Sequence, residues 1–328
     1  MKFILKFISA ILLFGLGWMG IYLFTFSSVE NGENQIHQKN FNQDYKIYSL
    51  VSPKKMDFAK EPVPLTIIDV KEKLDRELLV NTYWQSQTLL FFKRSNRYFP
   101  LIEQILKANN IPEDFKYLAL IESGLEHVVS PAGATGFWQI MKTTGKQYGL
   151  EITDEIDERY HVEKSTRAAC KYLREAYEKF GSWTLAAASY NMGISGLSRQ
   201  LTKQDVNNYY DLLLNAETGR YVYRILAIKQ ILEHPKDYGF TFLDDHLYPA
   251  IPTQDTLIAS PITDLAKFAK EKSINYKILK TLNPWLRTNE LSASVTKNYT
   301  IQLPSNNFKS LVPLDTAGYE PDSLEVND

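Results

Sequence analysis

Apolar residues recur at helical spacing through the middle of this 328-residue chain, and one such run contains a glutamate. In the stretch PEDFKYLALIESGLE, Phe115, Leu118 and Ala119 follow the i, i+3, i+4 spacing, and Glu122 is the next position on that face. Apolar side chains also cover most of the other faces, which is typical of a buried helix. Gly124 is a common end signal. The pattern therefore predicts a carboxyl group in the last turn of a buried helix.

The predicted position of Glu122 favours its protonated form. Burial raises the pKa of a carboxyl group, and the negative end of a helix dipole raises it further. A free Glu titrates near ~4.3, and an apolar pocket lifts this value to roughly 6 or above. Such a group can hold a proton at neutral pH and donate it. The alternative is a Glu at the helix edge whose side chain simply reaches water.

The periodicity changes along the chain and divides it into segments. Helical spacing dominates from Leu74 to His234 and includes a short amphipathic helix, LIEQILKANN, directly after Pro100. After Pro235 the order becomes a short apolar run, two helices and a final strand, a small βααβ pattern. We therefore expect a mainly α protein with these segments: an N-terminal membrane anchor (1–28), a polar tether (29–73), a helical domain (74–235), a linker (236–256), a βααβ module (257–305) and a disordered acidic tail (306–328).

The N-terminal anchor is predicted from an uncharged run between Phe7 and Phe26, about the length that spans a bilayer. Lys2 and Lys6 precede this run, so the positive-inside rule places the N-terminus in the cytoplasm. We therefore expect a single membrane-spanning segment, with the rest of the chain in the periplasm or cell envelope. A cleaved signal peptide is the alternative, although its apolar core is normally shorter and ends at a clear small-residue site.

Composition narrows the possible chemistry. The net charge of -1 gives no indication of a nucleic-acid partner. A single cysteine, Cys170, excludes an internal disulfide framework and any multi-cysteine metal site. The five histidines show no ligand spacing, so we expect neither a metal nor another cofactor.

Four motifs occur in a fixed order within the helical domain. They are IESG around Glu122, SPAGATGFWQIM from Ser130 to Met141, AASYNMG from Ala187 to Gly193, and ETGRYVYRILA from Glu217. Together they resemble the lytic transglycosylases with a goose-type-lysozyme-like fold, and among these the membrane-bound murein transglycosylase D group. The resemblance covers residues 97–233 and implies a lysozyme-like helical catalytic domain that acts on the glycan strands of peptidoglycan.

The resemblance also implies a reaction that needs a single carboxyl group. In this family one Glu protonates the oxygen of a β-1,4 glycosidic bond, then removes the proton from the 6-hydroxyl of the same N-acetylmuramic acid. That hydroxyl attacks the anomeric carbon and leaves a 1,6-anhydro ring. Glu122 matches the family's catalytic Glu. Glu126 is a weaker candidate because it follows Gly124, and Glu217 is expected to support the structure of the last motif.

Further site residues are implied one by one from the same motifs. Those expected to contact substrate or to line the cleft near the catalytic Glu are Ser130, Gln139, Met141, Tyr190, Asn191 and Tyr221. A structural role for Ser123 is as compatible with the sequence as a catalytic one, and Trp138 is expected either to stack on a sugar ring or to pack in the core. For Tyr190 and Tyr221, the alternative is packing in the core with the hydroxyl hydrogen-bonded within the protein.

Two positions depart from the family pattern. Phe137 replaces the usual Leu, which keeps an apolar side chain with a larger volume. Met192 replaces the usual Ala after Tyr190-Asn191, and its longer side chain can narrow a subsite. The preferred substrate is therefore less well defined than the type of reaction.

The C-terminal segment resembles a divergent LysM module, a small fold that binds glycans containing N-acetylglucosamine. The matching stretches are Leu265-Ala266, Leu279, Leu282-Asn283-Pro284 and the final strand from Tyr299 to Pro304. The opening glycine-and-aromatic strand of that family is absent. The alternative is a small packing domain without a ligand.

Three functions are compatible with these residues. The first is an anchored lytic transglycosylase acting on peptidoglycan. The second is a hydrolytic goose-type lysozyme that uses the same Glu with water. The third is an inactive scaffold that binds the cell wall, and Glu122 argues against it because a buried acid is costly to retain without a use.

Overall fold

The computed structural model describes residues 32, 34–40, 47–294 and 296–305. The chain divides into two units, Met1–Ser49 and Leu50–Asp328, and the described residues 34–40 of the first unit are helical. The predicted anchor and the predicted acidic tail lie outside the described residues. Within the described residues, no helix combines the length and the apolar character that crossing a bilayer requires.

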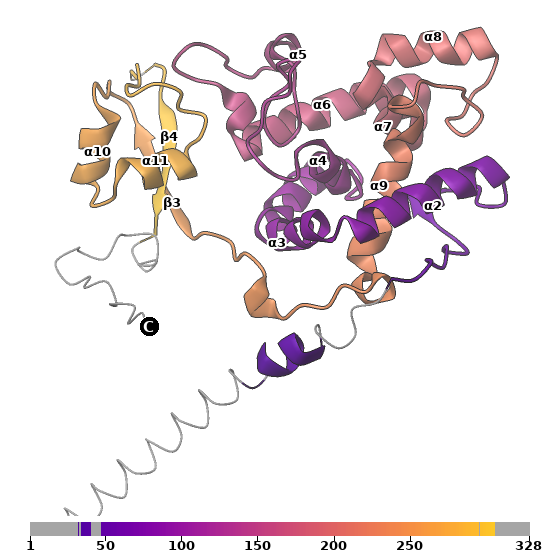
Figure 1. Cartoon of the computed structure of the whole chain (residues 1–328). Helices are drawn as coiled ribbons and strands as arrows, with labels where there is room; N and C mark the ends of the chain where they lie inside the picture. Colours follow the sequence, from indigo (N-terminus) through magenta and orange to yellow (C-terminus); the bar gives the residue numbers. More distant parts are fainter. Residues whose placement is uncertain (1–31, 33, 41–46, 295, 306–328) are drawn as a thin grey trace, which may run out of the picture. The chain divides into compact units, whose positions relative to one another are not determined.

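The second unit contains a helical domain that begins with a short hairpin (Figure 1). Its elements are β1 (Asp57–Phe58), β2 (Glu61–Pro62), α2 (Ile68–Tyr83), α3 (Gln85–Ala108), α4 (Phe115–Ser123), α5 (Lys142–Gln147), η1 (Glu158–Tyr160), α6 (Val162–Phe180), α7 (Trp183–Met192), α8 (Ile194–Gln204), α9 (Thr218–Glu233), η2 (Pro235–Tyr238) and η3 (Asp244–His246). The mainly α architecture expected from the periodicity is confirmed.

Helix α4 lies in the middle of the core, as its all-round apolar pattern predicts. Residues 117–121 are all buried, and Gly124 ends the helix with φ +63°. This left-handed conformation is one that glycine adopts without steric cost, and the Gly124 amide caps the helix by donating to the Leu120 carbonyl. Glu122 therefore lies in the last turn of a buried helix.

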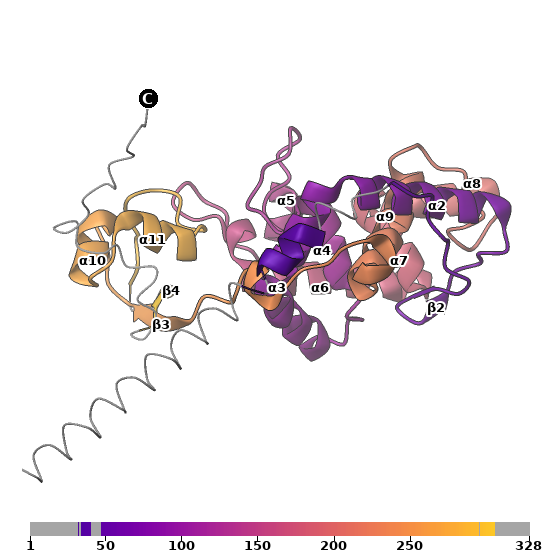
Figure 2. The same cartoon turned by 60° about the horizontal axis from the view of Figure 1, so that its bottom comes forward.

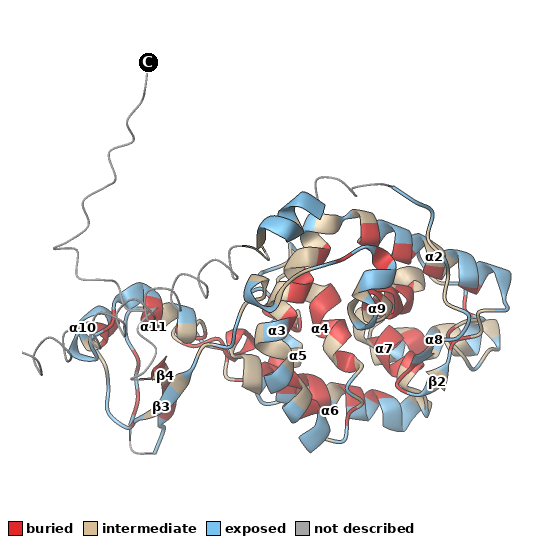
Figure 3. Ribbon diagram, turned by 90° about the horizontal axis from the view of Figure 1, so that it is seen from below, coloured by how far each residue is buried: buried red, intermediate tan, exposed pale blue. Residues whose placement is uncertain are grey.

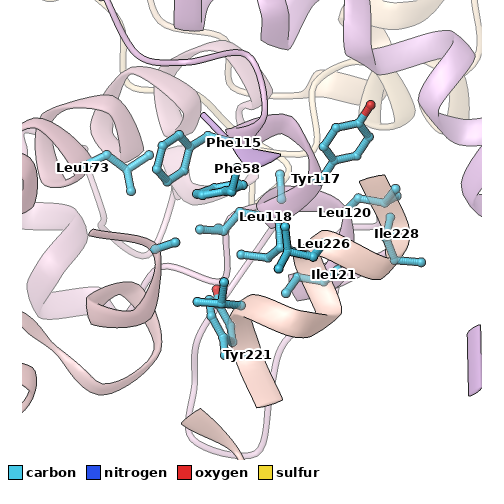
Figure 4. Close-up of a cluster of buried hydrophobic side chains, with 14 of the residues drawn as sticks. Phe58, Phe115, Tyr117, Leu118, Leu120, Ile121, Leu173, Tyr221, Leu226 and Ile228 are labelled. Atoms are coloured by element: carbon cyan, nitrogen blue, oxygen red, sulfur yellow. The ribbon is translucent and has the colours of Figure 1, made fainter. Parts of the chain in front are cut away.

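Helix α9 packs on α4, and α7 packs on α9 within the same core. Leu118 and Leu120 of α4 and Leu226 of α9 have no exposed surface, and the buried residues of these helices face one another (Figures 3 and 4). Helix α2 packs along the outer side of α9. The ends of these helices, which carry the motif residues, are thus fixed by a common core.

Helix α3 differs from its predicted extent. The sequence predicts a short helix after Pro100, whereas the structure has one helix, Gln85–Ala108, that contains this proline. Proline lacks an N–H and normally interrupts a helix. Here both halves have a buried apolar face, with Phe91 and Phe92 before the proline and Ile102 after it, and this burial offsets the lost hydrogen bond.

The folded domain also begins before Leu74. Phe58 in the β1–β2 hairpin has no exposed surface, and Val63 and Val70 are buried in the same core. Residues 57–73, which the sequence places in the polar tether, thus belong to the folded domain and contribute these buried side chains to its core. The isolated apolar residues of such a short hairpin have no sustained period, which is why the sequence pattern does not indicate them.

The segment expected to be a linker, residues 236–256, packs along α3. The rings of Phe240 and Phe242 lie 5.4 and 4.8 Å from that of Phe92. The Tyr248 amide donates to the Lys93 carbonyl (3.2 Å). Residues 253–256 already belong to the first strand of the module, so the predicted linker boundary is four residues too late.

The C-terminal module has the predicted βααβ order. It consists of β3 (Thr253–Ile258), α10 (Leu265–Glu271), α11 (Tyr276–Leu282) and β4 (Tyr299–Pro304), and the two strands pair antiparallel with Thr253 opposite Pro304. The buried Asn283 joins α11 to the sheet, because its side chain both accepts from and donates to the backbone of Gln302, each at 2.7 Å.

The acidic stretch before α6 contacts this module. The Asp157 amide donates to the Trp285 carbonyl (2.9 Å), and the Arg287 amide donates to the Glu155 carbonyl (2.7 Å). Ile156 is buried in the same apolar cluster as the module's core residues. The acidic residues therefore mark a contact surface within the second unit.

The hairpin's contribution to stability is testable with Phe58→Ala. Removal of a fully buried Phe side chain is expected to lower the free energy of unfolding by about 3–5 kcal/mol. Denaturant unfolding measures this change. Val51→Ala, at a residue 88% exposed, is the control and should stay within about 0.5 kcal/mol of the wild type. A Phe58→Ala protein as stable as the wild type would show that the hairpin does not belong to the core.

Candidate active site

Glu122 and Tyr221 meet where the last turn of α4 approaches the first turn of α9. The Tyr221 hydroxyl donates a hydrogen bond to Glu122 Oε1. Tyr221 is 2% exposed, so its hydroxyl has little access to water and depends on this partner. Glu122 keeps some exposed surface, although protein atoms crowd around its carboxyl group. This arrangement leaves one side of the carboxyl group able to face a ligand.

The surroundings of Glu122 raise its pKa above the ordinary value of 4.5. Burial is the largest cause, since it disfavours the charged form. The Tyr221 hydrogen bond and the positive charge of Arg224 act in the opposite direction, and the negative charge of Glu217 raises the pKa further. Because burial prevails, the carboxyl group holds its proton to a higher pH than a free glutamate does.

A pocket of about 230 Å³ lies between the segment 139–144 and helices α6 and α7. Four of the predicted site residues line it: Gln139, Met141, Tyr190 and Asn191. Burial and the charge of Glu122 both raise the pKa of Tyr190, so the Glu122 carboxylate acts electrostatically on a residue that lines the pocket. Four predicted residues thus line the pocket, and a fifth, Tyr221, contacts the carboxyl group of Glu122.

The segment that carries Gln139 is held in a strained turn. Gln139 has φ +45°, which is uncommon for a residue with a side chain. Its Nε2 atom donates to the carbonyls of Val128 (3.1 Å) and Gly136 (2.9 Å). A Cβ atom at Gly136 would lie 2.1 Å from the Arg159 carbonyl oxygen, so only glycine fits there. Arg159 closes the turn by donating from Nη1 to Gly133 (2.9 Å).

Tyr190 and Asn191 tie α7 to its neighbours at the pocket. The Tyr190 hydroxyl donates to the Trp138 carbonyl (2.8 Å). Asn191 donates from Nδ2 to Glu217 Oε1 (3.1 Å) and accepts from Thr218 Oγ1 (2.7 Å). The Asn191 amide therefore joins the end of α7 to the beginning of α9, in addition to lining the pocket.

Other candidates have structural contacts. Ser130 Oγ accepts from the Ala134 amide (3.0 Å) and is engaged in its own turn. Ser123 Oγ donates to the Phe137 carbonyl (2.9 Å). Trp138 has no exposed surface and donates to Thr166 Oγ1 (2.8 Å), which favours the core role over sugar stacking. Glu126 pairs with Arg94 (2.8 Å) on the surface.

Sequence reasoning did not identify Arg224 as a site residue. Its Nη2 atom donates to the Ile121 carbonyl (3.1 Å), beside Glu122, and its charge acts on the Glu122 pKa. Helical spacing contained a signal, because Arg224 lies three residues after Tyr221 and therefore on the same side of α9. Glu217, four residues before Tyr221, follows the same rule.

Comparisons with known proteins match two parts of the chain to known families. The transglycosylase SLT domain family matches residues 100–212, and the soluble lytic transglycosylase C-terminal LysM-like domain family matches residues 254–307. Membrane-bound lytic murein transglycosylase D from Escherichia coli strains K12 and O6:H1 is 30% identical over 238 residues, which cover 69% of this chain and 50% of the relative. The chain thus spans about half the length of these relatives.

Among solved structures, the 70 kDa soluble lytic transglycosylase of Escherichia coli is 22% identical to the chain. The match covers 42% of this chain and 24% of that protein, with a TM-score of 0.36.

The raised pKa of Glu122 predicts a stability change that depends on pH. Below the unfolded-state pKa, Glu122 is protonated in both the folded and the unfolded protein, so its ionisation does not lower the free energy of unfolding. As pH rises from there through the raised folded-state pKa, the buried carboxyl group ionises and destabilises the fold. Glu122→Gln removes this cost, so its melting temperature should exceed that of the wild type by an amount that grows from pH 4 to pH 8.

Calorimetry of both proteins over this pH range measures the difference. Glu113→Gln, at an exposed residue beyond the other end of α4, is the matched control. A Glu122→Gln protein that loses stability relative to the wild type as pH rises would contradict a raised pKa.

Proposed function

Because the chain contains a transglycosylase SLT domain and a LysM-like C-terminal domain and is homologous to membrane-bound lytic murein transglycosylase D, we propose that it is a lytic transglycosylase. Its proposed substrate is the β-1,4 bond between N-acetylmuramic acid and N-acetylglucosamine in peptidoglycan, and its proposed products end in 1,6-anhydro-muramic acid.

The raised pKa of Glu122 is the observation that carries this proposal. Where the structure resolves a shift for other carboxyl groups, at Asp69, Glu155 and Asp264, the pKa is lowered. Glu122 alone among these four has a raised value, and it lies beside the pocket. A general acid needs a proton that is retained near the working pH.

The proposed reaction uses Glu122 twice. The Glu122 O–H first protonates the glycosidic oxygen as the bond from this oxygen to the anomeric carbon breaks. The resulting carboxylate then removes the proton from the 6-hydroxyl, whose oxygen forms the new bond to the anomeric carbon. The proton returns to Glu122, and no water is consumed. The Tyr221 hydroxyl and the Arg224 charge stabilise the carboxylate between the two steps.

Hydrolysis is a second candidate because Glu217 lies close enough to raise the pKa of Glu122. Many glycosidases use two carboxyl groups, one of which activates a water molecule. Asn191 holds the Glu217 carboxylate at 3.1 Å, next to the pocket. Because one Glu217 oxygen already accepts this hydrogen bond, the geometry favours a supporting role for Glu217. Glu217 is nevertheless the residue to test for a role in hydrolysis.

The location proposed for the enzyme follows from the uncharged run near the N-terminus. We place this run across the cell membrane, with the catalytic domain in the periplasm or cell envelope beside its substrate. The relatives named above are described as membrane-bound. For the C-terminal module we propose binding to peptidoglycan glycan strands, which raises the local substrate concentration.

Mass spectrometry of peptidoglycan fragments tests the reaction. The detergent-solubilised chain should release muropeptides one water lighter than hydrolysis products, and Glu122→Gln should reduce their release by at least about a thousandfold, in the range of lost acid–base catalysis. Hydrated, reducible ends would show a lysozyme instead. Binding to peptidoglycan without release by the wild type would show a scaffold.

The charges around Glu122 predict shifts of the pH profile in opposite directions. Activity should fall as pH rises through the Glu122 pKa, because the general acid is lost. Glu217→Gln removes a negative charge and should move this fall to lower pH. Arg224→Met removes a positive charge and should move it to higher pH. Tyr221 and Tyr190, the other titratable groups facing Glu122, remain neutral throughout because their pKa values are raised.

Profiles of kcat/KM against pH measure these shifts, with Glu113→Gln as the control. Identical profiles for all variants would exclude Glu122 as the titrating acid. A Glu217→Gln protein that loses activity at every pH, together with hydrated products from the wild type, would favour the hydrolytic reaction.

A further inference from the structure

Four of the site side chains come from three helices, and each lies in a terminal turn of its helix. Glu122 lies in the last turn of α4, Tyr190 and Asn191 lie in the last turn of α7, and Tyr221 lies in the first turn of α9. Whatever fixes the opposite ends of these helices also fixes the positions of the site residues, because a helix is a stiff element. Helix α7 has 10 residues, so its two ends are roughly 15 Å apart.

The β1–β2 hairpin contacts all three helices at the ends away from the site. The Ala59 amide donates to Asp114 Oδ2 (2.7 Å), at the residue that precedes α4. Lys229, in the C-terminal half of α9, donates to the Asp57 carbonyl (3.1 Å) and to Asp114 Oδ2 (2.7 Å). One short segment thus connects α4 and α9 through a lysine and two aspartates.

Glu61 makes the corresponding contact with α7. Its carboxylate accepts from Ser182 Oγ (2.8 Å), the Trp183 amide (2.6 Å), the Thr184 amide (2.9 Å) and Thr184 Oγ1 (2.6 Å). The first amides of a helix have no partner within the helix, and the helix dipole favours a negative charge there. Figures 2 and 3 show β2 beside α7. Glu61 therefore caps a helix that begins 122 residues later in the chain.

Aromatic packing reinforces these polar contacts. The fully buried Phe58 ring lies edge-on to Phe115 of α4, with ring centroids 5.2 Å apart. Phe115 in turn lies 5.5 Å from Trp183, the first residue of α7. Figure 4 shows Phe58 beside Phe115 in the core. The row of three rings therefore fills the space between the hairpin and the amino ends of α4 and α7.

We propose that the β1–β2 hairpin is a positioning element of the active site, with Glu61 as its principal positioning residue. By holding the amino end of α7 it sets the location of Tyr190 and Asn191 at the far end, relative to Glu122. The hairpin lies outside residues 100–212, the part matched by the transglycosylase SLT domain family. The inference rests on the proposed function only because its test measures catalysis on peptidoglycan.

The test compares Glu61→Ala and the nearly isosteric Glu61→Gln with two controls in the full chain. Glu72→Ala removes an exposed carboxylate from α2, and Ile102→Val truncates a fully buried residue of α3, a helix that carries none of the site residues. Melting temperatures are measured first, and kcat and KM are then determined on peptidoglycan well below the lowest of them, so that every protein is folded.

The proposal predicts a loss of activity that stability does not explain. Glu61→Ala should lower kcat/KM at least about tenfold, and Glu61→Gln should lower it less, because the amide keeps one acceptor oxygen but turns an NH₂ group toward the donors of α7. The kcat/KM of Ile102→Val should stay within about twofold of the wild-type value, even if its melting temperature falls as far as that of Glu61→Ala. If Glu61→Ala does not fold, Glu61→Gln decides.

Lowered melting temperatures with unchanged kcat and KM in both Glu61 variants would overturn the proposal and leave the hairpin a purely stabilising element. A wild type that releases hydrated products would alter the proposed reaction but not this comparison, since the same helices carry the site. If the wild type releases no products, calorimetric titration with the N-acetylglucosamine tetramer replaces the assay. Glu61→Gln should then bind at least about tenfold more weakly, and equal binding would overturn the proposal.

Discussion

The hydrogen bond that Tyr221 donates to Glu122 joins the last turn of α4 to the first turn of α9, and the rest of the domain keeps these two turns together. Each partner needs the other. The buried hydroxyl of Tyr221 has little access to water, and the crowded carboxyl group of Glu122 needs a donor when it ionises. Burial nevertheless dominates, so the pKa stays raised. The hydrogen bond therefore reduces the free-energy cost of burying the ionised carboxyl group, but the pKa of Glu122 stays above its ordinary value.

The elements with a strong helical period were predictable from the sequence. Helix α4, its end at Gly124 and the position of Glu122 in the last turn are confirmed, because a nearly continuous apolar surface and a left-handed glycine are local signals. The βααβ order of the C-terminal module is confirmed for a similar reason. Pro100 was misleading, since local sterics favour a helix start there, whereas the burial on both sides of the proline makes one continuous helix.

The contacts that complete the site are not local, and helical spacing gives at most a shared side of one helix, as for Arg224 and Tyr221, but not the partner on another helix. Asn191 was expected to face substrate, and the structure shows that its amide also bridges to Glu217 and Thr218. Arg224 and Glu61 act on helices that are about a hundred residues away in the sequence or more. Such contacts exist only after the helices have packed, so a single sequence shows the residue types but not the partners.

The function proposed for Glu122 requires that it retain its proton above the pH at which an ordinary glutamate loses it. The most direct test is an infrared titration of the full chain, read as the difference between the wild type and Glu122→Gln, in which a carboxylic acid and a carboxylate have separate C–O stretching bands. We expect the acid band of Glu122 to persist above pH 4.5, its ordinary pKa. A carboxylate band fully developed at or below that value would contradict it.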